Sequence, residues 1–415
     1  MKRMYILILL FLSTSFTLLG QLEDQQIIRY LQKHSFNIEQ RKIDKPVRKK
    51  LKNASLIALG EIHGTQISYE ALSTLLEAIT RFSPIDYYLV ELDFSSSHFI
   101  NEYLKSGDEK YLDLVFSHFD GTFFYNESLV ESFKKIRDNG LLKNLKTIGT
   151  DIYHVPLTGI RHLNSVIDIN NLKHEDLPHI HALLSLPFNE IGYRNPDFIK
   201  LLQSSIKELE ENKAFIAKLP WANAYSEMEY ILKTMDISFQ IKKADEEKQD
   251  SLRDDQMFEN FRKLREQSGV KPSDKLFFFG GREHIIKAEL PYANKFISLM
   301  DRHLYPGKTV SISMFYAQSL FMIPNEQFGI EGEGKFSEKN FFNDNGPFFE
   351  TDNINLLIEA SGNSNIKGFD LSRKKSPFAT GNIFTKQYSS EHPTLKFFDF
   401  VIMIKNSKAT LSLKK

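Results

Sequence analysis

The sequence predicts an α/β protein with a central, mostly parallel sheet flanked by helices. Apolar runs of strand length at 55–60 ("SLIALG"), 85–93 ("IDYYLVELD") and 145–151 ("LKTIGTD") alternate with helical patterns. This alternation is typical of a parallel sheet with right-handed crossovers. The chain has 415 residues, of which 41% are hydrophobic and 26% charged, so it is long enough to bury a large core.

The first segment has the layout of a secretory signal peptide. Lys2 and Arg3 precede an uncharged apolar run over residues 4–19, and the small residue Gly20 follows. The run is shorter than the roughly 20 apolar residues that a membrane span needs. No later segment is long and apolar enough to span, and the absence of cysteine excludes disulfides and a lipid-modified cysteine. We therefore expect residues 1–20 to be cleaved and the mature chain to be periplasmic or secreted, in a bacterium, with no stable membrane span.

The elements that follow are read from their periodicity. Apolar residues recur at spacings of three and four over 67–79, and again over 129–136, which predicts a helix after each of the first two strands. Residues from about 158 to 267 look helical throughout, so we expect an insertion that caps one edge of the sheet. Beyond it, "DKLFFFGG", "TVSISMFYAQ", "NINLLIEA" and "KFFDFVIMIK" are expected as strands, which gives a β-rich C-terminal part within a single domain over 21–415.

The charge balance limits the class of partner. Lys and Arg number 53, as do Asp and Glu, so no overall field attracts the protein to nucleic acid. We expect a small-molecule or peptide substrate bound at a local site. The oligomeric state leaves no trace in the sequence.

Polar side chains follow each of the first four strands of the expected parallel sheet. In open α/β sheets the ligand crevice lies outside the carboxyl ends of the strands, so these side chains should converge there. Two of the histidines share a spacing, since each stands three residues after a glycine at a strand end. The candidate site residues are Glu61, His63, Glu91, Asp151, Arg253, Arg282 and His284.

Two chemical schemes remain open for this site, and both are hydrolytic. His63 and His284 with a strand-end carboxylate would suit a divalent metal such as Mn, Co, Zn or Fe, which would lower the pKa of a bound water. Without a metal, His63 held by a carboxylate would act as general base on water. In either scheme Arg282 or Arg253 would stabilise the developing oxyanion.

Several of these polar residues also have a simpler, structural interpretation. Asp151 could merely cap the next helix, and Glu91 at the end of an apolar strand needs a partner whatever its role. Histidines near loop starts and on a helical pattern are expected to be plain surface residues; they are His98, His118, His154, His174, His179 and His181.

The motifs "ALGEIHGT", "YLVELD", "IGTD", "RDDQMFEN" and "FFFGGREHI", in this order, resemble the superfamily that joins the erythromycin esterases, the haem-binding ChaN proteins and the Tiki metalloproteases. The resemblance covers about residues 50–290. The esterase branch implies carboxylates and histidines that activate water. The Tiki branch implies His63, Glu91 and His284 as metal ligands, and the ChaN branch implies haem binding.

The sequence therefore predicts an exported hydrolase that cleaves an ester or amide bond, with water activated by His63 or by a bound divalent metal. The alternative is a haem- or iron-binding protein without turnover.

Overall fold

The computed structural model describes residues 23–38, 40, 43–142, 144–218, 223–332 and 334–414. The expected signal peptide, residues 1–20, lies outside this part of the chain. Among the helices of the described residues, none combines the length and apolar character that a membrane crossing requires.

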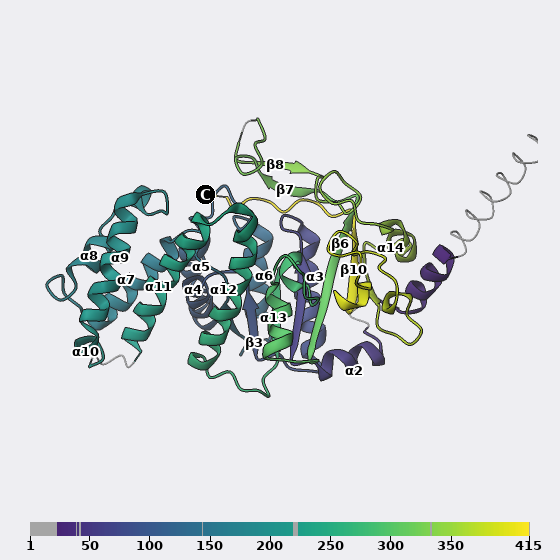
Figure 1. Ribbon diagram of the computed structural model, residues 1–415, viewed down its shortest axis with the longest axis horizontal. Coiled ribbons are helices and arrows are strands. Elements are labelled where there is room, and N and C mark those ends of the chain that lie inside the picture. The colour runs from purple at the N-terminus through teal and green to yellow at the C-terminus, as the bar shows by residue number, and fades with distance from the viewer. Residues whose placement is uncertain are drawn as a thin grey trace, which may run out of the picture.

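The centre of the molecule is an eight-stranded sheet (Figure 1). Six neighbouring strands are parallel. At one edge the next strand pairs antiparallel with them, and the last strand pairs antiparallel with that one, which confirms the expected, mostly parallel fold class. In spatial order the strands are β1 (Ser35–Phe36), β9 (Ile366–Asp370), β10 (Phe400–Lys405), β6 (Thr309–Ala317), β2 (Leu56–Glu61), β5 (Leu276–Gly281), β3 (Tyr87–Val90) and β4 (Lys146–Gly149).

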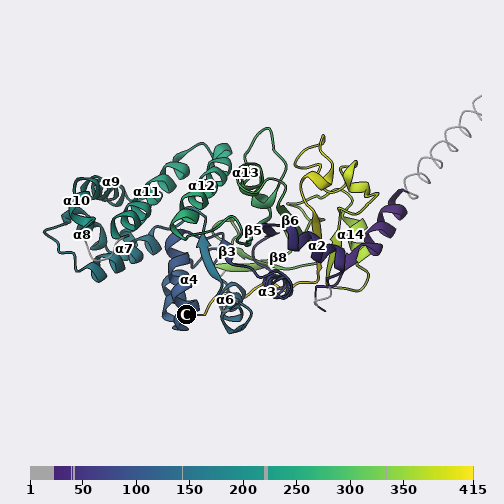
Figure 2. The same cartoon turned by 90° about the horizontal axis from the view of Figure 1, so that it is seen from below.

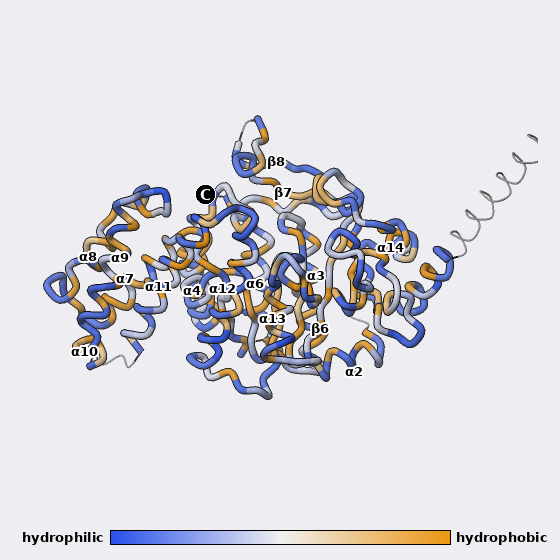
Figure 3. The backbone as a smooth tube through the Cα atoms, in the orientation of Figure 1, coloured by the Kyte–Doolittle hydropathy of each residue, from blue (hydrophilic) through white to orange (hydrophobic). Residues whose placement is uncertain are grey.

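Both faces of the sheet are covered, which explains why its inner strands are apolar without alternation. Ile57 and Leu59 of β2 face one apolar cluster, whereas Leu56 and Ala58 face another. Figure 3 shows the hydrophobic segments concentrated along these central strands. The first face is packed by α3 (Gln66–Thr80), α4 (Phe94–Ser106), α5 (Lys110–Phe116) and α6 (Glu127–Asp138). The second is packed by α12 (Glu246–Gln267), α13 (Phe296–His303) and α14 (Ile354–Ser361).

Helices α3 and α6 match the two expected from periodicity, whereas α4 and α5 were not expected. The segment 94–98, "FSSSH", has weak helix propensity, yet α4 forms because Asp93 caps it and accepts a hydrogen bond from Ser96 N at 2.8 Å. A further helix, α2 (Lys45–Asn53), precedes β2.

The expected strand "NINLLIEA" is wrong, because this segment forms the helix α14. Its buried residues Ile354, Leu357 and Ala360 recur every three positions and face the core. A short apolar run does not separate helix from strand by periodicity alone.

Residues 157–218 and 223–243 form a helical insertion that projects to one side of the sheet (left in Figures 1 and 2). It has its own apolar cluster and contains α7 (Leu157–Asn170), α8 (Pro178–Leu184), α9 (Pro196–Glu211), α10 (Lys213–Ile216) and α11 (Ala224–Lys243). Helix α12 then leads back to the sheet and into β5.

A small antiparallel sheet of β7 (Phe321–Pro324) and β8 (Phe336–Lys339) lies at the top of Figure 1. It contacts the turn after β2, where Met322 N donates a hydrogen bond to Gly64 O at 2.9 Å. Gly64 has a φ of 102°, and a Cβ there would lie 2.6 Å from Met322 O. Glycine is thus required at this turn both by backbone conformation and by close packing.

Candidate functional site

The strands whose ends carry the predicted polar groups are neighbours in the order β2, β5, β3 and β4. Because they are parallel, their carboxyl ends meet at one edge of the sheet. A cavity of about 240 Å³ at this edge is lined by Glu61, His63, Glu91, Arg253, Arg282 and His284 among others.

Glu91 is the centre of the cluster. It follows β3, and its side chain is 5% exposed. Its Oε1 accepts from Arg253 Nη2 at 2.6 Å, and lies 3.2 Å from His284 Nε2 and 3.8 Å from His63 Nε2. Burial alone would raise the pKa of Glu91, but the positive charges of His284, His63 and Arg253 hold it well below its usual range.

Backbone groups also contact the carboxylate of Glu91. Oε2 of Glu91 accepts a hydrogen bond from Gly281 N. A Cβ on Gly280 would lie 2.6 Å from the same oxygen. Gly280 is paired in register with Gly60, where a Cβ would lie 2.4 Å from Ile285 Cγ1. Gly280 therefore leaves room for the carboxylate of Glu91, and Gly60 leaves room for Ile285.

Glu61 and His63 form a second pair. Nδ1 of His63 contacts Oε1 of buried Glu61, whose Oε2 has no hydrogen-bond partner. Burial raises the pKa of Glu61. Burial opposes a charge on His63, yet Glu61 and Glu91 together raise its pKa well above the usual value. The rings of Phe123 and Phe124 pack beside the imidazole, with centroids 5.9 and 5.2 Å away.

Arg253 and Asp151 join two further elements to the cluster. Asp151 does not cap the next helix; it accepts from Arg253 through Nε at 2.8 Å and Nη2 at 2.6 Å. Arg253 lies on α12, where Asn260 also donates to the carbonyl of Asp151 at 3.1 Å. Arg253 and Asn260 thus tie α12 to the end of β4. Burial opposes the charge of Asp151, but Arg253 and His154 hold its pKa below the usual range.

His284 is clamped between two acids. Its Nδ1 lies 2.7 Å from Asp254 Oδ1 and its Nε2 faces Glu91. Asp254 also accepts from Phe296 N at 2.8 Å, which fixes its orientation. Burial disfavours the charged ring, but Asp254 and Glu91 outweigh it and raise the pKa of His284 to about 10. Asp254 was not among the residues expected at the site, and its spacing to His284 carries no sequence signal.

Arg282 reaches the cavity from the other side. Its Nη1 forms an ion pair with buried Asp344 at 2.7 Å, and its guanidinium lies between the rings of Phe315 and Phe349. Its Nη2 has no hydrogen-bond partner although the side chain is 2% exposed. Asp344 was missed by the sequence analysis because it lies in a loop, "FNDNGP", that looks like an ordinary turn.

The three strand-end residues expected as metal ligands do not suit a divalent ion as they stand. Oε1 of Glu91, the oxygen nearest to both histidines, already binds the Arg253 guanidinium at 2.6 Å. A metal needs a free lone pair on each ligand, and a cation beside it opposes binding. Among the described residues, three ligand atoms gather within 4.8 Å of one another at His98, His162 and Glu227 instead.

The histidines expected on the surface are only partly so. His174 and His179 are exposed, and His181 is half-buried. The expectation was wrong for three half-buried ones: His154 lies 3.0 Å from Asp151 Oδ2, and burial lowers the pKa of His98 and of His118 to about 3. Tertiary packing covers them.

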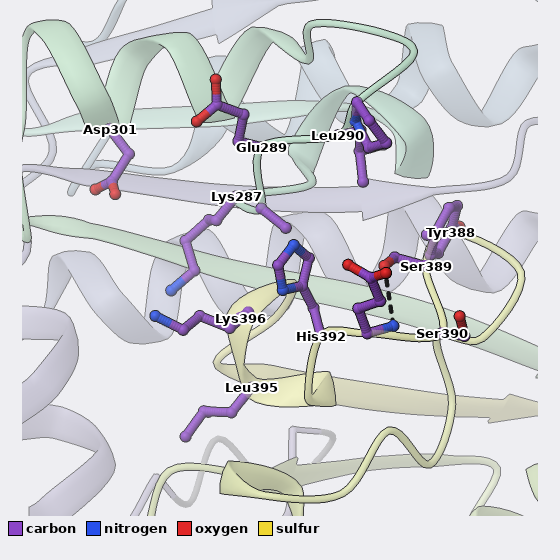
Figure 4. Close-up of a pocket in the computed structure, with 13 residues that line it drawn as sticks. Lys287, Glu289, Leu290, Asp301, Tyr388, Ser389, Ser390, His392, Leu395 and Lys396 are labelled. Carbon is purple, nitrogen blue, oxygen red and sulfur yellow. Dashed lines mark hydrogen bonds between the residues drawn. The ribbon is translucent and has the colours of Figure 1, made fainter.

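A larger cavity, of about 1100 Å³, lies next to the site (Figure 4). Its labelled residues come from the segment after β5, from 388–396, and from Asp301 on α13. Tyr388 in its wall donates a hydrogen bond at 2.8 Å to Glu283, which lines the smaller cavity. The two spaces therefore share a wall.

Neither a protein-family model nor a curated protein matches the sequence. Solved structures do match. A succinoglycan biosynthesis protein has a TM-score of 0.66 at 15% identity, covering 94% of this chain and 99% of that one. A Bacillus cereus protein has a TM-score of 0.63 at 15% identity with the same coverages. A mutant of erythromycin esterase EreC in its open conformation has a TM-score of 0.64 at 14% identity, covering 90% and 97%. The chain thus has the fold of an erythromycin esterase.

Proposed function

We propose that this protein is a hydrolase that cleaves an ester or amide bond in the cavity at the ends of β2, β3 and β5. The observation that carries the proposal is the Glu61–His63 pair. Glu61 orients the imidazole through Nδ1, so that Nε2 is left for a water molecule at the cavity. The side chain of His63 is 24% exposed, whereas its partner is 1% exposed. This is the arrangement of a base held by a buried orienting acid.

The neighbouring groups fit the remaining tasks. As water attacks the carbonyl carbon, Nε2 takes its proton and later delivers it to the leaving group. Arg282 has an unpartnered Nη2 that can donate to the oxyanion. Arg253 is less suited, because Nε and Nη2 are already bound to Asp151 and Glu91. Asp151, Glu91 and Arg253 therefore act as positioning residues.

The protonation state of His63 sets the pH dependence of turnover. Because the pKa of His63 is raised, its imidazole must lose a proton before it accepts one from water. We expect kcat/KM to rise with pH, with an apparent pKa above about 6.5. Glu91→Gln removes one of the two negative charges that raise the pKa, so the rise should move to lower pH.

The test is turnover of a panel of chromogenic esters, lactones and amides. His63→Ala should abolish turnover and keep the circular dichroism spectrum, whereas His174→Ala, at an exposed histidine, should leave both unchanged. Turnover that survives His63→Ala, or a wild-type protein inactive on the whole panel, would refute the proposal. Dialysis against a chelator should not change the rate; a loss restored by Mn, Co or Zn would favour the metal scheme.

The haem alternative finds less support in the geometry. An axial ligand needs a free ring nitrogen at an open face. His63 offers Nε2, but both nitrogens of His284 face carboxylates, so the two histidines do not both offer a ligand to haem iron as they stand. We also propose export: N-terminal sequencing of the mature protein should begin at about Gln21.

A further inference from the structure

A cluster outside the proposed active site brings two imidazoles and a carboxylate together. His98 comes from α4, His162 from α7 and Glu227 from the first turn of α11. One ligand atom from each lies within 4.8 Å of the other two. The rings of His98 and His162 are stacked, with centroids 3.8 Å apart and an angle of 23° between them.

Ordinary hydrogen bonding does not account for the contact between His162 and Glu227. His162 is fully buried, and its Nε2 lies 3.0 Å from Glu227 Oε1, yet no hydrogen bond of acceptable geometry satisfies that nitrogen. Two ligand atoms on one tetrahedral zinc lie about 3.3 Å apart, given Zn–N and Zn–O distances of about 2.0 Å. The separation is therefore close to that of two ligands on one ion.

The second ring nitrogen of His162 has a partner that suits ligation. Nδ1 of His162 lies 3.1 Å from Ser95 Oγ, which lies 2.7 Å from Tyr153 Oη. When Nδ1 donates its proton to Ser95, Nε2 keeps a lone pair for a metal. Metal-binding histidines almost always donate their other ring N–H in this way.

A charged stack is a poor alternative. Two imidazolium rings at this separation would repel each other. Among the described residues none forms a hydrogen bond with the His98 ring, which leaves its nitrogens available. Phe94 and Phe99 pack beside His162, with centroids 5.3 and 5.7 Å away, and limit the access of water.

We propose that His98, His162 and Glu227 bind one divalent transition-metal ion, with zinc as the favoured class and a water molecule in the fourth position. Two imidazoles and a carboxylate are the donor set that zinc accepts. Helix α4 packs on the sheet, whereas α7 and α11 belong to the insertion. The ion therefore fastens the helical insertion to the sheet.

The test is a titration of chelator-treated, full-length protein with Co²⁺, followed by the visible absorption of the four-coordinate ion and by zinc content. Wild type and His63→Ala should each bind one equivalent. His98→Ala and Glu227→Gln should weaken binding by at least ~100-fold, and Ser95→Ala by ~10–100-fold, as expected for a group that orients a ligand. His181→Ala is the matched control, because His181 and His174 form a histidine pair in the same insertion, with centroids 5.6 Å apart.

Zinc should also slow proteolysis within the insertion in wild type and in His181→Ala, but not in His98→Ala. Circular dichroism checks that each variant is folded. No saturable binding in wild type, or equal affinity in His98→Ala and Glu227→Gln, would overturn the proposal. Binding lost in His63→Ala but kept in His98→Ala would place the ion at the strand ends instead, and would overturn it as well.

Discussion

Arg253→Met is the perturbation that most directly tests how the site is held. Arg253 binds two buried carboxylates at once, Asp151 at 0% and Glu91 at 5% exposure. Methionine keeps much of the side-chain volume and helix propensity but removes every donor. Both acids then lose a cation that offsets their burial.

The expected magnitude follows from this burial. Removing one partner of a buried ion pair costs about 3–5 kcal/mol, because a charge is left without compensation. Glu91 keeps His284 and the backbone donor of Gly281, and Arg253 is itself 18% exposed, so we expect the low end, about 3 kcal/mol.

The sign of the pH dependence is also fixed. In wild type the lowered pKa of Asp151 contributes stability that is present above the ordinary value of about 3.9 and is lost as pH falls through the lowered one. In the variant the unpaired carboxylate is relieved by protonation. The difference between the two proteins should therefore narrow below about pH 4.

The assay is urea unfolding of both proteins at neutral and acid pH. Arg262→Met on the same helix is the control, since Arg262 and Glu259 are 51% and 41% exposed and their pair is worth about 1 kcal/mol at most. A loss below about 1 kcal/mol for Arg253→Met, similar to the control, would refute the view that this guanidinium holds the site together.

Three other predictions concern the same region. His284→Gln should lower the free energy of unfolding most below about pH 6.5, and the loss should fade as pH rises to about 10. The reason is that the neighbouring acids, which raise the pKa of His284, stabilise only its charged form. A pH-independent difference in urea unfolding would contradict this. Gly280→Ala should destabilise by about 1–3 kcal/mol through overlap with Glu91, whereas Gly192→Ala, which meets nothing within 4 Å, should stay within about 0.5 kcal/mol; equal melting temperatures would disprove the close approach. Arg282→Met should cost about 3–5 kcal/mol by leaving Asp344 buried and unpaired, and adding Asp344→Asn should recover part of that loss in thermal unfolding; no recovery would argue against the ion pair.

The predicted convergence at the strand ends was correct because it depends on chain direction alone. Parallel strands place their carboxyl ends at one edge, so Glu61, Glu91, Asp151 and Arg282 were bound to meet there. Their pairing was not predictable. β5 lies between β2 and β3, although about 185 residues separate it from β3 along the chain. The position of β5 in the sheet brings His284 to Glu91.

Local pattern was least informative where packing decides burial. Residues 353–360 look like a strand but pack as a helix, and His98 looks like a surface residue but stacks on His162. In both cases the deciding contacts come from segments distant in sequence.

By itself the sequence determined the α/β class, the helical character of the insertion and the set of acids and histidines at the strand ends, because these follow from periodicity and chain direction. The tertiary structure decided which acid pairs with which cation. It placed Glu91 among His63, His284 and Arg253, gave His284 a second acid in Asp254, and joined His162 of α7 to Glu227 of α11. The physical reason is that burial makes an unpaired charge costly, so each charge is matched by whichever opposite charge the fold brings within reach.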